Sequence, residues 1–120
     1  MSSFDQHVYN NIQDKIMSSR RQLANVDSQL TIQYRESRKN EITKSELEAL
    51  PNSTETYLSV GKMFSSKPKD SIIADLEKQT KLTKATYESL TKKKKFLEKE
   101  LKDASDSLKD FIHHSTRLQG

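Results

Sequence analysis

Apolar side chains recur every three or four residues along two long stretches of this chain, and a short middle segment with another pattern separates them. In the first stretch, a seven-residue repeat (a to g) with Tyr9 and Ile16 at position a places Ile12 and Val26 at position d. Six of the eight a and d positions between residues 9 and 33 are apolar. A narrow apolar seam of this kind is typical of a helix that pairs with another helix.

The second stretch carries the same repeat over a greater length. Between Ile73 and Leu118, ten of the fourteen a and d positions are apolar. A repeat of 3.5 residues implies supercoiling with a partner helix, and the nearest partner is the chain's own first helix. We therefore expect helices at about residues 5–40 and 69–118, paired antiparallel.

The lengths of the two helices suggest how they pair. Counting outward from the middle places Leu23 near Tyr87 and Tyr9 near Leu101. The last two turns of the second helix then have little or nothing opposite them. Apolar residues in those turns would not be buried within the chain: Phe111, Ile112 and Leu118.

Residues that break helices occur only in the middle of the chain, apart from the final glycine. They are Pro51, Gly61 and Pro68. The preceding residues 43–46 (Thr-Lys-Ser-Glu) match a capping box, which predicts a short connecting helix at about residues 44–50 that ends at Pro51.

A β-hairpin is predicted at residues 55–66, because Gly61-Lys62 between two β-compatible runs is typical of a type II′ turn. A lone hairpin is marginally stable in water, and this one has two open edges and apolar residues on both faces. Packing against the chain's own helices is the alternative, but the open edges favour assembly with other chains. The residues expected to form that assembly site are Tyr57, Leu58, Val60, Gly61, Met63 and Phe64.

The predicted fold class is mainly α: a long antiparallel two-helix coiled coil joined by a short helix and one central β-hairpin. The connecting helix and hairpin occupy about residues 43–67, and the chain forms one domain, 1–120. Composition agrees, because hydrophobic residues make up 32% of the chain, against about 45–50% in ordinary globular domains. Too little apolar surface is present for a many-layered fold.

The chain contains no cysteine, so no disulfide or thiolate site is possible. Its first residues lack the apolar core of a signal peptide, and no window is apolar enough for a membrane span. We expect a soluble, cytoplasmic protein. His113 and His114 point about 100° apart on a helix and do not share a site. Without a phosphate loop or a nucleophile motif, we expect no metal, no cofactor and no enzymatic activity.

The net charge of +4 is unevenly distributed. Residues 1–60 contain seven basic and eight acidic side chains, whereas residues 61–120 contain fourteen and nine. The run Lys92–Lys95 is open to three interpretations: a solvated coiled-coil face, a contact with a protein partner, or a nucleic-acid site. Interleaved acidic residues and the lack of a stacking platform favour the first and disfavour the last.

The order of long helix, hairpin and long heptad helix resembles the β-type subunits of prefoldin. Residues 60–64 (Val-Gly-Lys-Met-Phe) follow that family's V-G-(R/K)-M-F pattern. The resemblance implies a subunit of a heterohexameric chaperone with two α-type and four β-type subunits, joined through hairpins that form β-barrels. It further implies that coiled-coil tips hold unfolded actin, tubulin and other clients and deliver them to the cytosolic chaperonin without using a nucleotide.

The residues expected at the client-binding tips come from both ends of the chain, which antiparallel helices bring together. Phe111 could instead close the seam by packing on Phe4 or Val8, so Ile112 is the better candidate for client contact. A structural coiled-coil adaptor or tether is the main alternative function, and a basic helix protein that binds nucleic acid is a second one. The proposed tip residues are Phe4, Val8, Phe111, Ile112 and Leu118.

Overall fold

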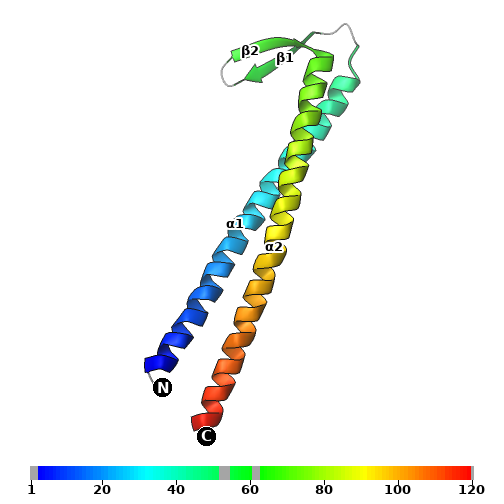
Figure 1. Cartoon of the computed structure of the whole chain (residues 1–120). Helices are drawn as coiled ribbons and strands as arrows, with labels where there is room; N and C mark the ends of the chain where they lie inside the picture. Colours follow the sequence, from blue (N-terminus) through cyan, green and yellow to red (C-terminus); the bar gives the residue numbers. More distant parts are fainter. Residues whose placement is uncertain (1–2, 52–54, 61–62, 120) are drawn as a thin grey trace. The chain divides into compact units, whose positions relative to one another are not determined.

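Two long helices and two short strands make up the computed structural model (Figure 1). It describes residues 3–51, 55–60 and 63–119, with the backbone alone for residues 55–60, 63–67, 118 and 119. The order of elements is α1 (Ser3–Glu48), β1 (Glu55–Val60), β2 (Met63–Pro68) and α2 (Lys69–Gln119). Pro51 and Pro68 fall between the helices, and Asp70 in the first turn of α2 suits the positive end of the helix dipole.

The chain divides into two compact units. Unit 1 consists of Met1–Leu30 and Leu90–Gly120, and unit 2 consists of Thr31–Ser89. Unit 1 thus contains the first part of α1 and the last part of α2. Unit 2 contains the end of α1, both strands and the start of α2.

The interior of unit 1 coincides with the predicted heptad seam. Its buried side chains all occupy a or d positions, and Val26 is the most enclosed, with 2% of its surface exposed. Ser19, a small residue, is buried at a d position, where it leaves room for larger neighbours. The buried set comprises Ile16, Ser19, Val26, Leu97 and Ala104.

Polar side chains take part in the interior of unit 2. Among its described side chains, Leu47 and Ile72 are the buried apolar ones, and Asn40 and Lys69 are also buried. The seam positions Gln33, Ser37, Thr80 and Thr83 are half-buried. Tyr87, which the sequence predicts in the seam, lines a small cavity together with Gln33 and Ser37 of α1 and is 41% exposed.

The predicted fold class is wrong in its connection, because the separate short helix at residues 44–50 does not exist. Residues 43–46 lie inside α1, which continues without interruption to Glu48. The heptad explains this: Asn40 and Leu47 carry the d positions onward and are both buried, so continuing the helix buries more surface than stopping it. After Glu48, the amide of Leu50 donates to the Leu47 carbonyl at 3.1 Å, a tighter turn that ends α1 before Pro51.

The longer α1 also changes the pairing of the helices. In unit 1 the rings of Tyr9 and Phe111 lie 6.3 Å apart, centre to centre. Tyr9 was expected near Leu101, so the observed partner lies ten residues further along α2. The expectation that the last turns of α2 lack a partner is therefore wrong for Phe111, which is half-buried against α1.

β1 and β2 pair antiparallel and form a two-stranded sheet. The register pairs Val60 with Met63 and Leu58 with Ser65, as the sequence pattern suggests. β2 extends to Pro68, opposite Glu55, two residues beyond the predicted second strand. The predicted turn residues Gly61 and Lys62 lie outside the described residues.

Candidate functional site

The two strands of unit 2 offer open edges. In the part of the chain that the structure describes, β1 pairs with β2 and with no third strand. The outer edge of each strand therefore carries backbone N–H and C=O groups that another strand could pair with. The predicted assembly residues Tyr57, Leu58, Val60, Met63 and Phe64 lie in these strands, and their side chains are outside the described part of the structure, as is all of Gly61.

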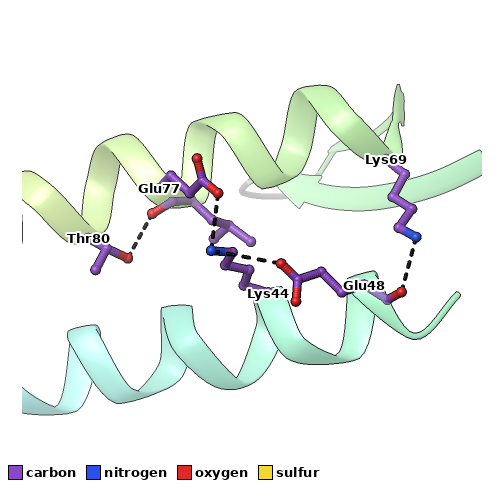
Figure 2. A network of polar contacts seen from close by, with 6 residues as sticks. Lys44, Glu48, Lys69, Glu77 and Thr80 are labelled. Carbon is purple, nitrogen blue, oxygen red and sulfur yellow. Dashed lines mark hydrogen bonds and ion pairs between the residues drawn. The ribbon is translucent and has the colours of Figure 1, made fainter.

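A buried lysine ties the end of α1 to the start of α2 within unit 2 (Figure 2). The ammonium of Lys69 donates to the Leu50 carbonyl at 2.6 Å and to the Glu48 carbonyl at 3.3 Å. The last carbonyls of a helix have no partners within the helix, and they form its negative end. Lys69 therefore supplies both hydrogen bonds and positive charge where α1 has no basic residue of its own in its last turn.

The sequence analysis did not predict a role for Lys69, although the heptad pattern contains a signal for one. Extending the heptad of α2 backward by one d position from Leu76 arrives at residue 69. A lysine at that position, one residue after Pro68, is a candidate cap for the preceding helix.

A second polar link in unit 2 is centred on Lys44 (Figure 2). Its ammonium lies 3.1 Å from a carboxylate oxygen of Glu77 on α2 and 3.8 Å from one of Glu48 on α1. The hydrogen bond to Glu77 and the charge of that carboxylate raise the pKa of Lys44 above 10.5. All three side chains are well exposed, so these ion pairs add little to the free energy of unfolding. Their main effect is on which residues of α1 and α2 lie opposite each other.

The predicted tip residues lie at the chain-end part of unit 1. Phe4 is 73% exposed and Ile112 is 50% exposed, whereas Val8 and Phe111 are half-buried. Phe111 contacts Tyr9, which is not one of the predicted tip residues. Leu118 belongs to α2, and its side chain is outside the described part. Among the four tip residues whose side chains are described, Phe4 and Ile112 are thus the ones most exposed to solvent.

The lysine run on α2 separates into two kinds of residue. Lys94, at an a position, pairs with Asp27 of α1 at 2.8 Å. Lys92, Lys93 and Lys95 are exposed. The run is therefore not uniform, because one member links the helices of unit 1 and the others face solvent.

A metal-binding arrangement is not found among the described residues. No group of three or more His, Asp or Glu side chains is placed to hold a metal ion there. A small cavity of about 160 Å³ in unit 2 lies between α1 and α2, and its lining residues are Gln33, Tyr34, Ser37, Thr83, Lys84, Tyr87 and Glu88. Neither helix, over its described residues, includes a stretch apolar enough to span a bilayer.

The described residues form two long helices joined through a two-stranded sheet, with exposed apolar side chains near the ends of the chain. A family model described as "Prefoldin subunit" matches residues 10–114. The protein belongs to the prefoldin subunit family.

Individual relatives agree with this assignment. The probable prefoldin subunit 1 of Dictyostelium discoideum is 27% identical over 112 residues, which cover 93% of this chain and 97% of the relative. Prefoldin subunit 1 of Homo sapiens is 25% identical, with 87% of this chain and 85% of the relative covered. The probable prefoldin subunit 1 of Caenorhabditis briggsae is 31% identical, with 87% and 89% covered.

The fold is also that of a solved structure. The crystal structure of the prefoldin beta subunit from Thermococcus strain KS-1 matches with a TM-score of 0.77 and 22% identity, covering 85% of this chain and 90% of that one. Prefoldin subunits are non-enzymatic chaperone components, so the chain is a subunit of a prefoldin co-chaperone that oligomerises with other prefoldin subunits. The prediction that it is not an enzyme is confirmed by this membership.

Proposed function

We propose that the whole chain, residues 1–120, acts as one β-type subunit of a heterohexamer of two α-type and four β-type prefoldin subunits. The observation that carries the proposal is the two-stranded sheet of unit 2, whose strands each have one partner among the described residues. A strand from another subunit can add to such an edge, with backbone hydrogen bonds supplying affinity and alternate side chains fixing the register. Residues 60–64 follow the V-G-(R/K)-M-F pattern of the β-type hairpin.

The chain-end part of unit 1 is proposed to bind unfolded protein. Phe4 and Ile112 present apolar surface to solvent there, and we include Phe111, Val8 and Leu118 in the proposed site. A few exposed side chains bind weakly, because ordering a flexible client costs free energy. Several subunits that contact one client together gain affinity through effective concentration, and weak single contacts still permit release.

The clients and destination follow from the family resemblance. We propose that unfolded actin and tubulin are held and then passed to the cytosolic chaperonin, without nucleotide and in the cytoplasm.

The experiment that tests assembly is native mass spectrometry of the complex purified through a tag on this chain. We expect a discrete particle of about six small subunits. The variant Val60→Asp with Phe64→Asp should be absent from that particle, because two buried charges without partners in a shared barrel are strongly destabilising. Circular dichroism of the isolated variant should retain the helical signal of the wild type.

The matched control carries Ser28→Asp and Ser89→Asp, which add the same charge at exposed helix positions. It should join the particle normally. A hairpin variant that assembles as well as this control would remove the proposed role of the strands. A homodimer or a free monomer from wild-type cells would instead favour the alternative, a coiled-coil adaptor or tether.

A further inference from the structure

Four lysines on α2 form a stripe along one side of unit 1. Lys92, Lys95, Lys99 and Lys102 follow one another at intervals of three, four and three residues. At 3.6 residues per turn, they fall within about 80° of the helix circumference and extend over about 15 Å. We call this set the lysine stripe.

The lysine stripe faces solvent and is unneutralised in the described part of the chain. All four side chains are exposed, and no ion pair within that part involves them. Lys94, by contrast, turns toward α1 and pairs with Asp27 at 2.8 Å. The helix thus uses Lys94 for its own pairing and leaves Lys92 and Lys95 to the lysine stripe.

An exposed aromatic ring borders the lysine stripe. Phe96 lies one turn after Lys92 and one turn before Lys99, and it is 61% exposed. It occupies a c position, away from the seam, so helix pairing does not explain it. Glu100 and Asp103 follow on the side of Phe96, one and two turns further along.

We propose that the lysine stripe and Phe96 bind extended acidic segments of polypeptide that also carry an apolar side chain. In an extended chain, every second side chain points to the same side, about 7 Å apart. Neighbouring lysines of the stripe are about 5–6 Å apart along the helix surface, and their flexible stems adjust to the difference. Carboxylates at alternate positions would meet the lysines, and one apolar side chain would pack on Phe96.

A polypeptide fits this surface better than a nucleic acid does. Glu100 and Asp103 beside Phe96 would repel a continuous phosphate backbone. A polypeptide, in contrast, has backbone N–H groups that can donate hydrogen bonds to these two carboxylates. A single ring also provides no platform on which successive bases stack. The backbone N–H groups of a polypeptide and the single exposed ring therefore favour an acidic polypeptide over a nucleic acid as the occupant.

The inference deepens the proposed function and rests on it in one respect, because it treats the acidic segment as part of an unfolded client. It adds a class of client that the apolar tips do not select. Binding through exposed ion pairs should be weak and strongly reduced by salt, which is compatible with release.

The test uses a labelled synthetic peptide of alternating Glu and Ser with one central Phe, titrated in fluorescence anisotropy against the assembled complex and against the full chain alone. The stripe variant carries Lys92→Gln, Lys95→Gln, Lys99→Gln and Lys102→Gln. Its affinity at low salt should fall about tenfold or more, since four exposed ion pairs with the peptide are lost together. Phe96→Ser alone should weaken binding about threefold, because part of a phenyl ring loses its apolar contact.

The matched control removes the same number of charges from unit 1 outside the stripe, through Lys15→Gln, Arg20→Gln, Arg21→Gln and Arg117→Gln. It should bind the peptide nearly as well as wild type. Equal weakening in both variants, no binding by wild type, or tighter binding of a single-stranded RNA of the same charge would each overturn the inference.

The same complexes are also assayed for suppression of aggregation of a neutral unfolded protein. If wild type suppresses that aggregation but ignores the acidic peptide, the stripe inference fails and the proposed function stands. If the peptide binds but aggregation is not suppressed, the proposed function fails, and the acidic site remains established by the peptide titration.

Discussion

Lys69 is buried, although lysine is among the residues that folded proteins bury least often. Its position is favourable because the last turn of α1 contains Glu46 and Glu48 and no basic residue, and negative side chains at a helix C-terminus are unfavourable. The ammonium compensates by donating to the carbonyls of Glu48 and Leu50.

Replacing Lys69 with Met should lower the free energy of unfolding by about 1–3 kcal/mol, because hydrogen bonds from a charged group are lost while the volume is kept. Urea denaturation followed by circular dichroism measures this. Lys78→Met, at an exposed position of the same helix, is the control and should change stability much less. Equal losses in the two variants would mean that the cap contributes nothing.

Lys44 gives unit 2 a dependence on pH. Its pKa in the folded chain is raised above 10.5 by the hydrogen bond and the charge of Glu77. A group whose pKa is raised in the folded state stabilises that state at lower pH. This stabilisation is lost as the pH increases through the folded-state pKa. Wild type should therefore lose more stability than Glu77→Gln does as the pH rises above the ordinary lysine pKa of about 10.4. Parallel stability curves for the two proteins would contradict this link.

At the scale of elements, the ends of α1 and α2 in unit 1 combine structural and exposed side chains. Phe111 is half-buried and its ring contacts Tyr9. Ile112, the next residue, is 50% exposed. Phe111 and Ile112 are adjacent in the sequence, yet the first packs within unit 1 and the second faces solvent.

Phe111→Ala should lower the free energy of unfolding by about 1–3 kcal/mol, since it removes a partly buried ring and its aromatic contact. Ile112→Ser should change that free energy by less than about 0.5 kcal/mol, yet reduce capture of unfolded actin by the assembled complex. Denaturation and an aggregation assay, run on both variants, separate the effects. The division of roles would be refuted by an Ile112→Ser chain that is strongly destabilised.

The seam could be predicted from sequence because periodic burial leaves a periodic pattern. Ile16, Val26, Leu97 and Ala104 were all assigned to it and all are buried. The end of α1 could not be predicted, because the capping-box pattern at residues 43–46 is a local signal that the continuing seam overrides. The pairing error followed directly, since the pairing depends on where α1 ends.

The candidate site was predictable only in part. Exposed Phe4 and Ile112 were expected at the chain ends, because no partner could be assigned to them. The Tyr9–Phe111 contact and the Lys69 cap were not expected, since both depend on the correct helix pairing.

At the scale of the molecule, the two units differ in what their helix pairs bury. Unit 1 encloses Ile16, Val26 and Leu97. In unit 2 the hydroxyls of Thr80 and Thr83 donate to carbonyls of their own helix, at 2.8 Å each, so they do not bond across the seam. Each polar seam position gives up about 1 kcal/mol or more of apolar burial.

Hydrogen exchange of the full chain without partners should therefore be slower in unit 1 than in residues 33–40 and 80–87. We expect local opening there to be at least about tenfold more frequent than around Val26 and Leu97. Replacing Thr83 with Leu should slow exchange in unit 2 and leave unit 1 unchanged. Uniform protection along both helices would show that the seam opens as one cooperative piece.

The Lys69 contact has a consequence for the kinetics of association. It joins residues 48 and 69, which are 21 positions apart, and so closes the loop that contains both strands. The entropy of closing that loop is lost when the chain folds rather than when a partner arrives. In the assembly proposed above, an incoming subunit would meet strands that are already restrained, and a larger share of encounters would lead to productive docking.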